Sequence, residues 1–305
     1  MAERNKRTGS DTPEPDPAEP AAIGAEARGG AQRGIQSIEV GGQLLRALVH
    51  HGRPMALKDL AREADMTAAK AHPYMVSFGR LGLIEQDRGN GHYQLGPLAL
   101  QLGLISLQQA NPVQVAGPLA AQLAQTIGQT VAIVVWGARG ATIVHIAESP
   151  TPVHVNMRHG TVFSLVDTAS GKLFAAFRDP AEVRRLLEEE RLRAQRRSKA
   201  AAAGADMPGA ARPLGMPREH PLPPWEAFEP QLQEVRERGL SRSQGEVIPG
   251  VNAMAAPVFN HAGDLVLALT AIGPAGVFDI DWDGAVAQAM RATAREASLR
   301  LGARL

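Results

Sequence analysis

The clearest hydrophobic pattern in the chain lies between Ala56 and Leu95, where helical spacing changes to strand spacing. Leu57, Leu60 and Ala61 are spaced i, i+3, i+4, which predicts a short helix beginning near Leu57. A longer apolar pattern from Ile35 to Val49 predicts another helix before it. These positions indicate a small helical domain near the start of the chain.

A second helix in this stretch has clear signals at both ends. Thr67 offers an N-cap hydroxyl oxygen, which can accept a hydrogen bond from a first-turn amide. Ala71, Met75 and Phe78 then form one apolar stripe. Gly82 suits a helix C-cap, because glycine reaches the left-handed conformation without steric cost. The two helices and the short turn between them predict a helix-turn-helix.

A β-hairpin is predicted directly after the second helix. Segments 83–87 and 92–96 flank Asn90-Gly91, a strong signal for a tight hairpin turn. Helix, turn, helix and two-stranded ribbon make a winged helix-turn-helix, which favours DNA binding.

The alternative to DNA binding is a helical subdomain that binds protein. Two features count against it: the first turn of the second helix is small and polar, as the major groove requires, and Arg88 at the wing tip can reach a phosphate.

The rest of the chain predicts a second, larger domain of mixed type. An apolar helix from Pro97 to Ala110 and another from about Val113 to Ile127 come first. The expected strands are 130–136, 142–149, 152–157, 239–250, 251–260 and 264–273. The expected helices are one within 159–177, then 181–200, 224–239 and a last one that ends at Leu305. Antiparallel strands with flanking helices indicate an α+β sheet domain.

Composition excludes several classes of protein. The chain has 305 residues, which favours two domains, and 44% of them are apolar. It has no cysteine, so disulfides and thiolate metal sites are excluded. No apolar run reaches the roughly 18 residues of a membrane span, and the start lacks the apolar segment of a signal peptide. We therefore expect a cytoplasmic protein with no membrane partner.

Charge alone gives no support to DNA binding. The net charge is +1, and residues 34–97 hold seven Lys or Arg against six Asp or Glu. The hypothesis of DNA binding therefore depends on where the cations lie.

The expected organisation is a disordered tail at 1–33, a DNA-binding domain at 34–97, a linker helix at 98–112 and an α+β domain at 113–305, with a flexible Ala/Pro-rich insertion at about 198–224.

Six segments, each at its expected structural position, resemble one family, the IclR-type bacterial transcriptional regulators. They are IQSIE, DLAREADMTAAKAHPYM, GLIEQD with GHYQLGPLALQLG, MRHGTVFSLVDTASGKLFAAF, RERGLSRSQGEVIPGVNAMAAPVF and ALTAIGP. The resemblance implies a winged helix-turn-helix, a linker helix and a GAF-like α+β effector-binding domain. It also implies a homodimer or homotetramer that binds palindromic operator DNA and responds to a small organic or aromatic acid.

The second helix of the helix-turn-helix and the wing are expected to contact DNA. Lys70 and His72 are expected in the major groove, with Thr67 and Tyr74 near phosphates. The full expected set is Lys58, Thr67, Ala69, Lys70, His72, Tyr74 and Arg88. Pro73 departs from the family, in which Arg is more frequent at this position. Because proline removes a backbone donor and crowds the carbonyl of Ala69, we expect a kinked helix or a 3₁₀ first turn, at up to ~3 kcal/mol.

The effector site implied by the resemblance combines a helix start with two strands. The expected residues are Ala169, Ser170, Ser243, Ala253, Thr270 and Ile272. Amides at the helix start favour an anion, whereas each hydroxyl has the alternative role of a local cap or strand-edge hydrogen bond. Ser243 is neutral where relatives carry an acidic side chain, so the ligand type can differ.

No catalytic constellation is found, so no enzyme activity, metal or cofactor is expected. Ser170-Gly171-Lys172 lacks the glycine and the Ser or Thr of a phosphate loop. His145, His154 and His159 have no carboxylate motif beside them, and no GxSxG elbow occurs. The main hypothesis is a ligand-gated transcriptional regulator. The alternative is a small-molecule sensor or protein-interaction module of the same fold that does not bind DNA.

Overall fold

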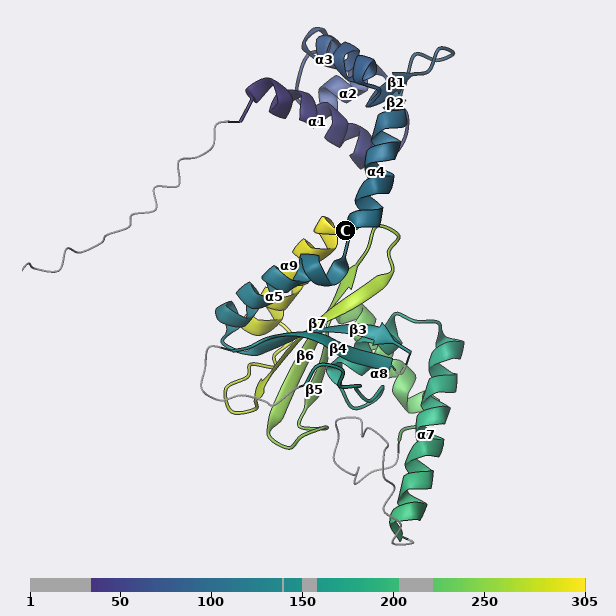
Figure 1. Ribbon diagram of the computed structural model, residues 1–305, viewed down its shortest axis with the longest axis vertical. Coiled ribbons are helices and arrows are strands. Elements are labelled where there is room, and N and C mark those ends of the chain that lie inside the picture. Colours follow the sequence, from purple (N-terminus) through teal and green to yellow (C-terminus); the bar gives the residue numbers. More distant parts are fainter. Residues whose placement is uncertain (1–33, 139, 150–157, 203–221, 305) are drawn as a thin grey trace, which may run out of the picture. The chain divides into compact units, whose positions relative to one another are not determined.

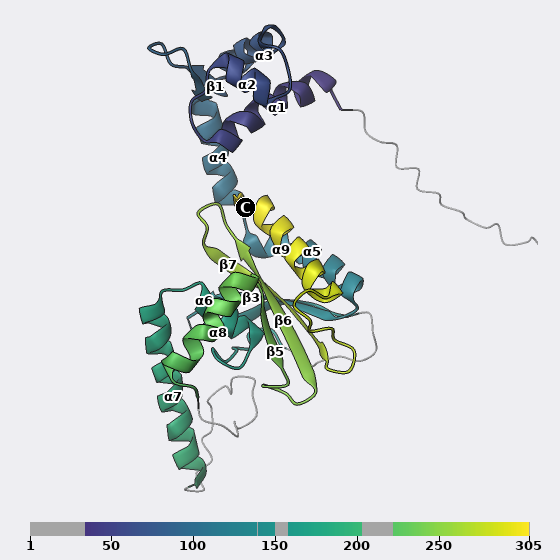
Figure 2. The ribbon, with the colours of Figure 1, turned by 180° about the vertical axis from the view of Figure 1, so that it is seen from behind.

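The computed structural model describes residues 34–138, 140–149, 158–202 and 222–304. The chain divides into two compact units, Met1–Gly103 and Leu104–Leu305, whose elements are labelled in Figures 1 and 2. The predicted tail at 1–33, the predicted strand at 152–157 and most of the predicted insertion lie outside the described residues.

The first unit contains the predicted winged helix-turn-helix. Its elements are α1 (Gln36–His51), α2 (Leu57–Glu63), α3 (Ala68–Leu81), β1 (Ile84–Gln86) and β2 (Tyr93–Leu95). Strands β1 and β2 pair antiparallel, and Met55 adds a single bridge to Tyr93. The core is formed by buried apolar side chains from all three helices and the ribbon, among them Leu44, Leu60, Met75 and Ile84.

The turn between α2 and α3 is closed by backbone hydrogen bonds. Asp65 has a φ of 52°, the left-handed conformation that glycine usually takes and that Asp tolerates better than most residues. The Met66 N–H donates to the Ala61 carbonyl at 2.9 Å, as in a Schellman cap. The Thr67 hydroxyl oxygen accepts from the Lys70 N–H at 3.3 Å, which confirms Thr67 as the N-cap. This turn fixes where α3 begins.

Helix α3 remains α-helical through Pro73. Every residue from Ala68 to Leu81 is α-helical, so the 3₁₀ first turn suggested for Pro73 does not form. Pro73 is exposed, on the side of α3 away from the buried Ala71 and Met75. A proline ring on the outer side leaves the packed side of the helix intact, which is why the local loss is limited to one amide hydrogen bond.

Gly41 allows α1 and α3 to pack closely. It is buried, and a Cβ at this position would lie 2.8 Å from Tyr74 Cδ1 and 2.9 Å from Phe78 Cζ. Both rings come from α3 and are partly buried against the core of this unit. The glycine therefore makes room for two aromatic rings, a gain that offsets its low helix propensity within α1.

Helix α4 (Pro97–Gln109) follows the wing and crosses the boundary between the two units. Its end confirms the prediction that the apolar helix stops before Asn111-Pro112. None of its residues is buried. Its exposed apolar side chains are Leu100, Leu102, Leu104, Ile105 and Leu107, which are 45–65% exposed in the single chain. Leu100, Leu104 and Leu107 lie on one side of the helix, and Leu102 and Ile105 lie on the opposite side. Exposed apolar surface of this extent is typical of a helix that another protein chain covers.

The second unit is the predicted α+β sheet domain. Its elements are α5 (Pro112–Ile127), β3 (Thr130–Gly137), β4 (Gly140–Ala147), α6 (Ala169–Ala176), α7 (Pro180–Ala202), α8 (Trp225–Arg238), β5 (Ser241–Gln244), β6 (Val251–Phe259), β7 (Leu265–Pro274) and α9 (Ala285–Arg300). The five strands are antiparallel and lie in the order β4-β3-β7-β6-β5. This order, with helices on both faces, agrees with the GAF-like fold that the resemblance implied.

Strand alternation sends successive side chains to two separate cores. Val131 and Ile133 of β3 pack with α5 and α9, whereas Ala132 and Val134 pack with α6 and α8. Figures 1 and 2 show α5 and α9 together on one face of the sheet and α6 and α8 on the other. The described strands are therefore covered on both faces, which explains why β3, β6 and β7 read as nearly continuous apolar runs.

Three predicted boundaries are wrong. Helix α7 extends to Ala202, into the segment predicted as a flexible insertion, because 199–202 is Lys-Ala-Ala-Ala and alanine has the highest helix propensity. The last helix ends at Arg300, and Gly302 follows in the left-handed conformation at φ 81°. The predicted strand 239–250 is strand only over β5, since Gly245 and Gly250 have φ of 70° and 79° and turn the chain into a loop.

Candidate functional site

The exposed side of α3 and the wing carry most of the side chains predicted to contact DNA. Six of the seven are exposed in the first unit: Lys58, Thr67, Ala69, Lys70, His72 and Arg88. The seventh, Tyr74, is half-buried, and its ring packs against Gly41. Tyr74 therefore has a packing role in addition to the phosphate contact predicted for it. The DNA-contact roles of all seven remain predictions.

The wing is held in shape by side-chain hydrogen bonds. Asp87 Oδ1 accepts from the Gly89 N–H at 2.7 Å, and Asn90 Oδ1 accepts from the His92 N–H at 2.8 Å. Gly91 has a φ of 72°, as expected for the second residue of an Asn-Gly turn. Arg88 is the central residue of the first Asx turn and is exposed. The turns therefore present its guanidinium on an ordered tip.

The three cations on α3 and the wing are free of protein partners. In the described part of the chain, Lys70, Arg80 and Arg88 form neither an ion pair nor a side-chain hydrogen bond. Arg62, by comparison, pairs with Asp59 at 2.7 Å. Unpaired cations on α3 and the wing can neutralise phosphates without first breaking an internal salt bridge.

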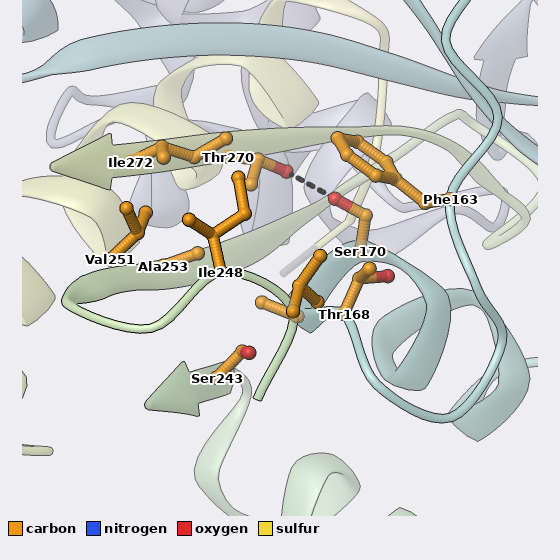
Figure 3. Close-up of a pocket in the computed structure, with 11 residues that line it drawn as sticks. Phe163, Thr168, Ser170, Ser243, Ile248, Val251, Ala253, Thr270 and Ile272 are labelled. Carbon is orange, nitrogen blue, oxygen red and sulfur yellow. Dashed lines mark hydrogen bonds between the residues drawn. The ribbon is translucent and has the colours of Figure 1, made fainter. Parts of the chain in front are cut away.

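The second unit contains a pocket lined by all six residues predicted for the effector site. Its full lining is Phe163, Thr168, Ala169, Ser170, Ser243, Val247, Ile248, Val251, Ala253, Thr270 and Ile272 (Figure 3). Ser243, Ala253 and Ile272 are direct neighbours in register across β5, β6 and β7. The empty space is about 450 Å³, including its solvent-filled mouth. Only about 50 Å³ of this space is open to the centre of a water-sized sphere, so the pocket of the single chain is narrow.

The start of α6 forms one wall of the pocket. Thr168 is its N-cap: the hydroxyl accepts from the Gly171 N–H at 2.9 Å and donates to the Ser164 carbonyl at 2.7 Å. Within the described residues, the N–H groups of Ala169 and Ser170 have no acceptor. Two free amides at a helix start give this wall a partial positive charge.

A pair of buried hydroxyls lies in the same wall. Ser170 Oγ and Thr270 Oγ1 are 2.9 Å apart, and both residues are 1% exposed (Figure 3). One of the two protons makes the bond between them, so the other O–H has no acceptor in the described part of the chain. Ser243 differs, because it donates to the Asp167 carbonyl at 2.9 Å, the local role weighed for each hydroxyl. At this wall, one O–H and two N–H donors therefore have no acceptor within the described chain.

Five lining residues were not predicted. Phe163 and Thr168 come from the segment before α6, and Val247, Ile248 and Val251 come from the β5–β6 loop and the start of β6. All five lie in sequence segments that resemble the family. The sequence signal that could have identified two of them is the Val247-Ile248 pair between Gly245 and Gly250. Two apolar residues in a loop flanked by glycines are expected to pack against another part of the domain.

Lys172 holds that loop to α6. Its Nζ donates to Glu246 Oε2 at 2.7 Å and to the Arg242 carbonyl at 3.2 Å. The Lys172 side chain is 10% exposed and that of Glu246 is 44% exposed. The lysine rejected as a phosphate-loop residue is thus an anchor between the pocket helix and the pocket loop.

The described residues contain no metal-binding group. No cluster of three or more His, Asp or Glu suited to a metal occurs among them, and His154 lies outside them. No helix of the described chain is long and apolar enough to cross a membrane.

Two family profiles match the chain. The profile described as bacterial transcriptional regulator IclR C-terminal matches residues 105–201 and 222–299, and the IclR helix-turn-helix domain matches residues 37–88. The chain belongs to the IclR family of bacterial transcriptional regulators. The winged helix-turn-helix of this IclR-family protein is therefore its DNA-binding domain, and the chain is a DNA-binding transcriptional regulator.

Individual relatives agree with this assignment. The glycerol operon regulatory protein of Streptomyces griseus is 30% identical over 242 residues, which are 79% of this chain and 86% of that protein. The crystal structure of Pseudomonas aeruginosa HmgR is similar with a TM-score of 0.73 at 33% identity, over 88% of this chain and 99% of that one. The Agrobacterium tumefaciens repressor BlcR, at 19% identity and a TM-score of 0.67 over 89% of this chain and 100% of that one, shares the fold.

Proposed function

We propose that this IclR-family regulator binds a small carboxylate in the pocket between α6 and β5–β7, and that this ligand changes its affinity for operator DNA. The observation that carries the proposal is the pocket wall formed by the start of α6. There, two backbone N–H groups and one hydroxyl lack protein acceptors within the described chain. Such a group of donors matches the oxygens of one carboxylate.

The rest of the pocket limits the size and character of the ligand. None of the eleven lining side chains is charged, and seven are apolar, so the non-carboxylate part of the ligand is compact and largely apolar. An aliphatic or aromatic organic acid fits this description. A ligand with a second charged group fits poorly, because that charge would be buried without a partner.

On the DNA side, we propose that α3 enters the major groove and the wing contacts the backbone. Lys70 and His72 contact bases, while Thr67, Tyr74 and Arg88 lie near phosphates, and Lys58 and Ala69 complete the surface. A symmetric oligomer would read a palindromic operator. The Streptomyces griseus relative is a glycerol operon regulatory protein, which supports control of a catabolic operon here.

We propose a homodimer or homotetramer in which α4 is covered by a second copy. The support is the exposed Leu and Ile side chains, which lie on opposite sides of that helix. The organisation proposed is a tail at 1–33, a DNA-binding domain at 34–97, a linker helix at 98–112 and an effector domain at 113–305. The protein acts where the DNA is, in the cytoplasm, and has no enzyme activity or cofactor.

The alternative, a sensor of the same fold that does not bind DNA, does not agree with the match of residues 37–88 to the IclR helix-turn-helix domain. The test is selection of duplexes from a random library, followed by titration of Lys70→Ala. Loss of a base contact should weaken binding by ~1–3 kcal/mol at that position and relax specificity there.

The control for this titration is Arg185→Ala, which removes an exposed cation from α7 in the second unit. It should leave DNA affinity unchanged. If Lys70 contacts only phosphate, the variant should weaken all duplexes equally and reduce the salt dependence of binding. Failure to select any duplex, or wild-type binding by Lys70→Ala, would contradict the proposed role.

A further inference from the structure

The outward side of the recognition helix α3 is apolar along its centre. Ala69, Pro73 and Val76 are spaced i, i+4, i+7 and therefore form one stripe on the helix. All three are exposed, and Val76 is 40% exposed. The stripe lies opposite Ala71 and Met75, which are buried against the core. It is therefore the part of α3 that faces away from the rest of its unit.

Polar groups near the stripe leave its centre free of hydrogen-bond donors. The Ser77 hydroxyl donates its proton to the Pro73 carbonyl at 2.9 Å, so it cannot donate to a base while that bond lasts. Lys70 lies on one side of the stripe, and Arg80 continues it one turn beyond Val76. Ala69, Pro73 and Val76 offer only methyl and methylene groups.

We propose that this stripe reads thymine methyl groups in the operator, so that part of the specificity of α3 comes from apolar contact with T·A pairs. The inference rests on DNA binding through α3. In the major groove, thymine alone among the four bases presents a methyl group, at C5. An apolar stripe gains from burying that group and gains nothing from the donor and acceptor edges of a G·C pair.

Charge favours DNA over a protein as the occupant of this stripe. Lys70 and Arg80, beside and beyond it, have no ion pair within the described residues. In the major groove of DNA, the thymine methyl group lies between two rows of phosphates. An apolar stripe with cations near it is complementary to this arrangement. Pro73 then contributes to recognition, because its ring adds apolar surface at a position where an arginine would instead contact a phosphate or a guanine.

The experiment removes one methyl group at a time. A duplex selected from a random library by the full chain is resynthesised with each thymine replaced in turn by deoxyuridine, which differs only by the C5 methyl. Dissociation constants are measured by fluorescence anisotropy. We expect one or two thymines in each half-site at which the replacement weakens binding roughly fourfold, the equivalent of about 0.8 kcal/mol for one buried methyl-sized group. At the other thymines the affinity should not change.

Variants then assign the methyl contact to the stripe. Val76→Ala should abolish the deoxyuridine effect at one sensitive thymine, and Pro73→Ala should reduce it at another or the same one. Val49→Ala is the matched control, because Val49 is an exposed valine of α1 in the same unit, 53% exposed. It should leave every deoxyuridine effect intact. Circular dichroism checks that the variants keep their helices.

Two results would overturn the inference while leaving DNA binding in place. One is a sequence-specific complex in which no deoxyuridine replacement changes the affinity. The other is a deoxyuridine effect that Val76→Ala, Pro73→Ala and Ala69→Gly all leave unchanged, since the methyl would then be read by another element. If no duplex can be selected at all, both this inference and the proposed DNA contacts fail together.

Discussion

Gly171 shows how the absence of one side-chain atom shapes the pocket. A Cβ at this position would overlap the Ser164 carbonyl oxygen and lie 2.8 Å from Leu165 Cα. The segment before α6 therefore packs directly on the helix backbone, where the Ser164 carbonyl accepts from the Thr168 hydroxyl. This close approach brings Phe163 and Thr168 to the pocket.

Replacing Gly171 should therefore destabilise the second unit. Gly171→Ala places a methyl group against the backbone of Ser164 and Leu165. We therefore expect the free energy of unfolding of the second unit to fall by about 1–3 kcal/mol. Gly117→Ala in α5 is the control, because nothing lies within 4 Å of a Cβ there. It should be neutral or stabilise by roughly 0.5–1 kcal/mol. Urea unfolding followed by tryptophan fluorescence reports on this unit, since all three tryptophans, Trp136, Trp225 and Trp282, lie in it. Equal stability of the two variants would contradict the packing argument.

At the scale of elements, the β5–β6 loop forms part of the pocket wall. It carries Val247 and Ile248 into the lining, and glycines with positive φ stand at both of its ends. Its internal bonds include the Gly245 N–H to the Val251 carbonyl at 2.9 Å. The ion pair from Lys172 is its link to α6. An anchor at one point between two glycine turns suits a loop that opens when a ligand enters or leaves.

Lys172→Met, which keeps the length of the side chain and removes its charge, should let this loop open more often. We expect faster hydrogen exchange at the amides of Gly245 and Val251, measured by mass spectrometry on the full chain, with α5 and α9 unchanged. Lys58→Met is the control, because Lys58 is exposed in the first unit. Exchange in the loop that is the same in wild type and Lys172→Met would show that the ion pair does not hold it.

Local sequence signals predict the elements well, whereas strand register is not encoded locally. Thr67, Gly82 and Asn90-Gly91 have side chains or conformations that act within a few residues, so the helix-turn-helix and wing follow from sequence alone. Ser243 and Ile272, by contrast, become neighbours only through β6, and no spacing rule gives that register. They were predicted because the chain resembles a family. The five further lining residues lie in segments with the same resemblance, but which of their side chains line the pocket depends on how the loops fold.

At the scale of the whole molecule, the exposed apolar surface of α4 predicts an oligomer. Static light scattering at tens of micromolar should give the mass of a dimer or tetramer. Ile105→Glu should lower that mass, because it puts a charge into an apolar interface. Leu192→Glu on α7 is the control, since Leu192 is 45% exposed on a charged helix. A monomeric wild type, or an effect of both variants alike, would contradict the role of α4.

Gating joins the two units in one function. A ligand changes DNA affinity only through its different affinity for the DNA-competent and DNA-incompetent states, a coupling of about 1–3 kcal/mol in typical cases. In the proposed regulator, α4 carries this coupling, because it is the continuous helix across the boundary between the units. Ligand binding in the pocket should therefore change the affinity for DNA. A substitution that blocks the pocket should remove this change and leave the affinity for DNA without ligand as it is.

The most direct measurement compares wild type with Ser170→Leu. Fluorescence anisotropy on a selected duplex is recorded with and without each of a panel of small aliphatic and aromatic carboxylates. We expect at least one carboxylate to shift the wild-type dissociation constant by about 5–150-fold. Ser170→Leu should bind the duplex like wild type without responding, because leucine fills the space beside Thr270, while Ser170→Ala should respond at higher ligand concentration. A Ser170→Leu protein that responds as wild type does would show that the effector binds elsewhere.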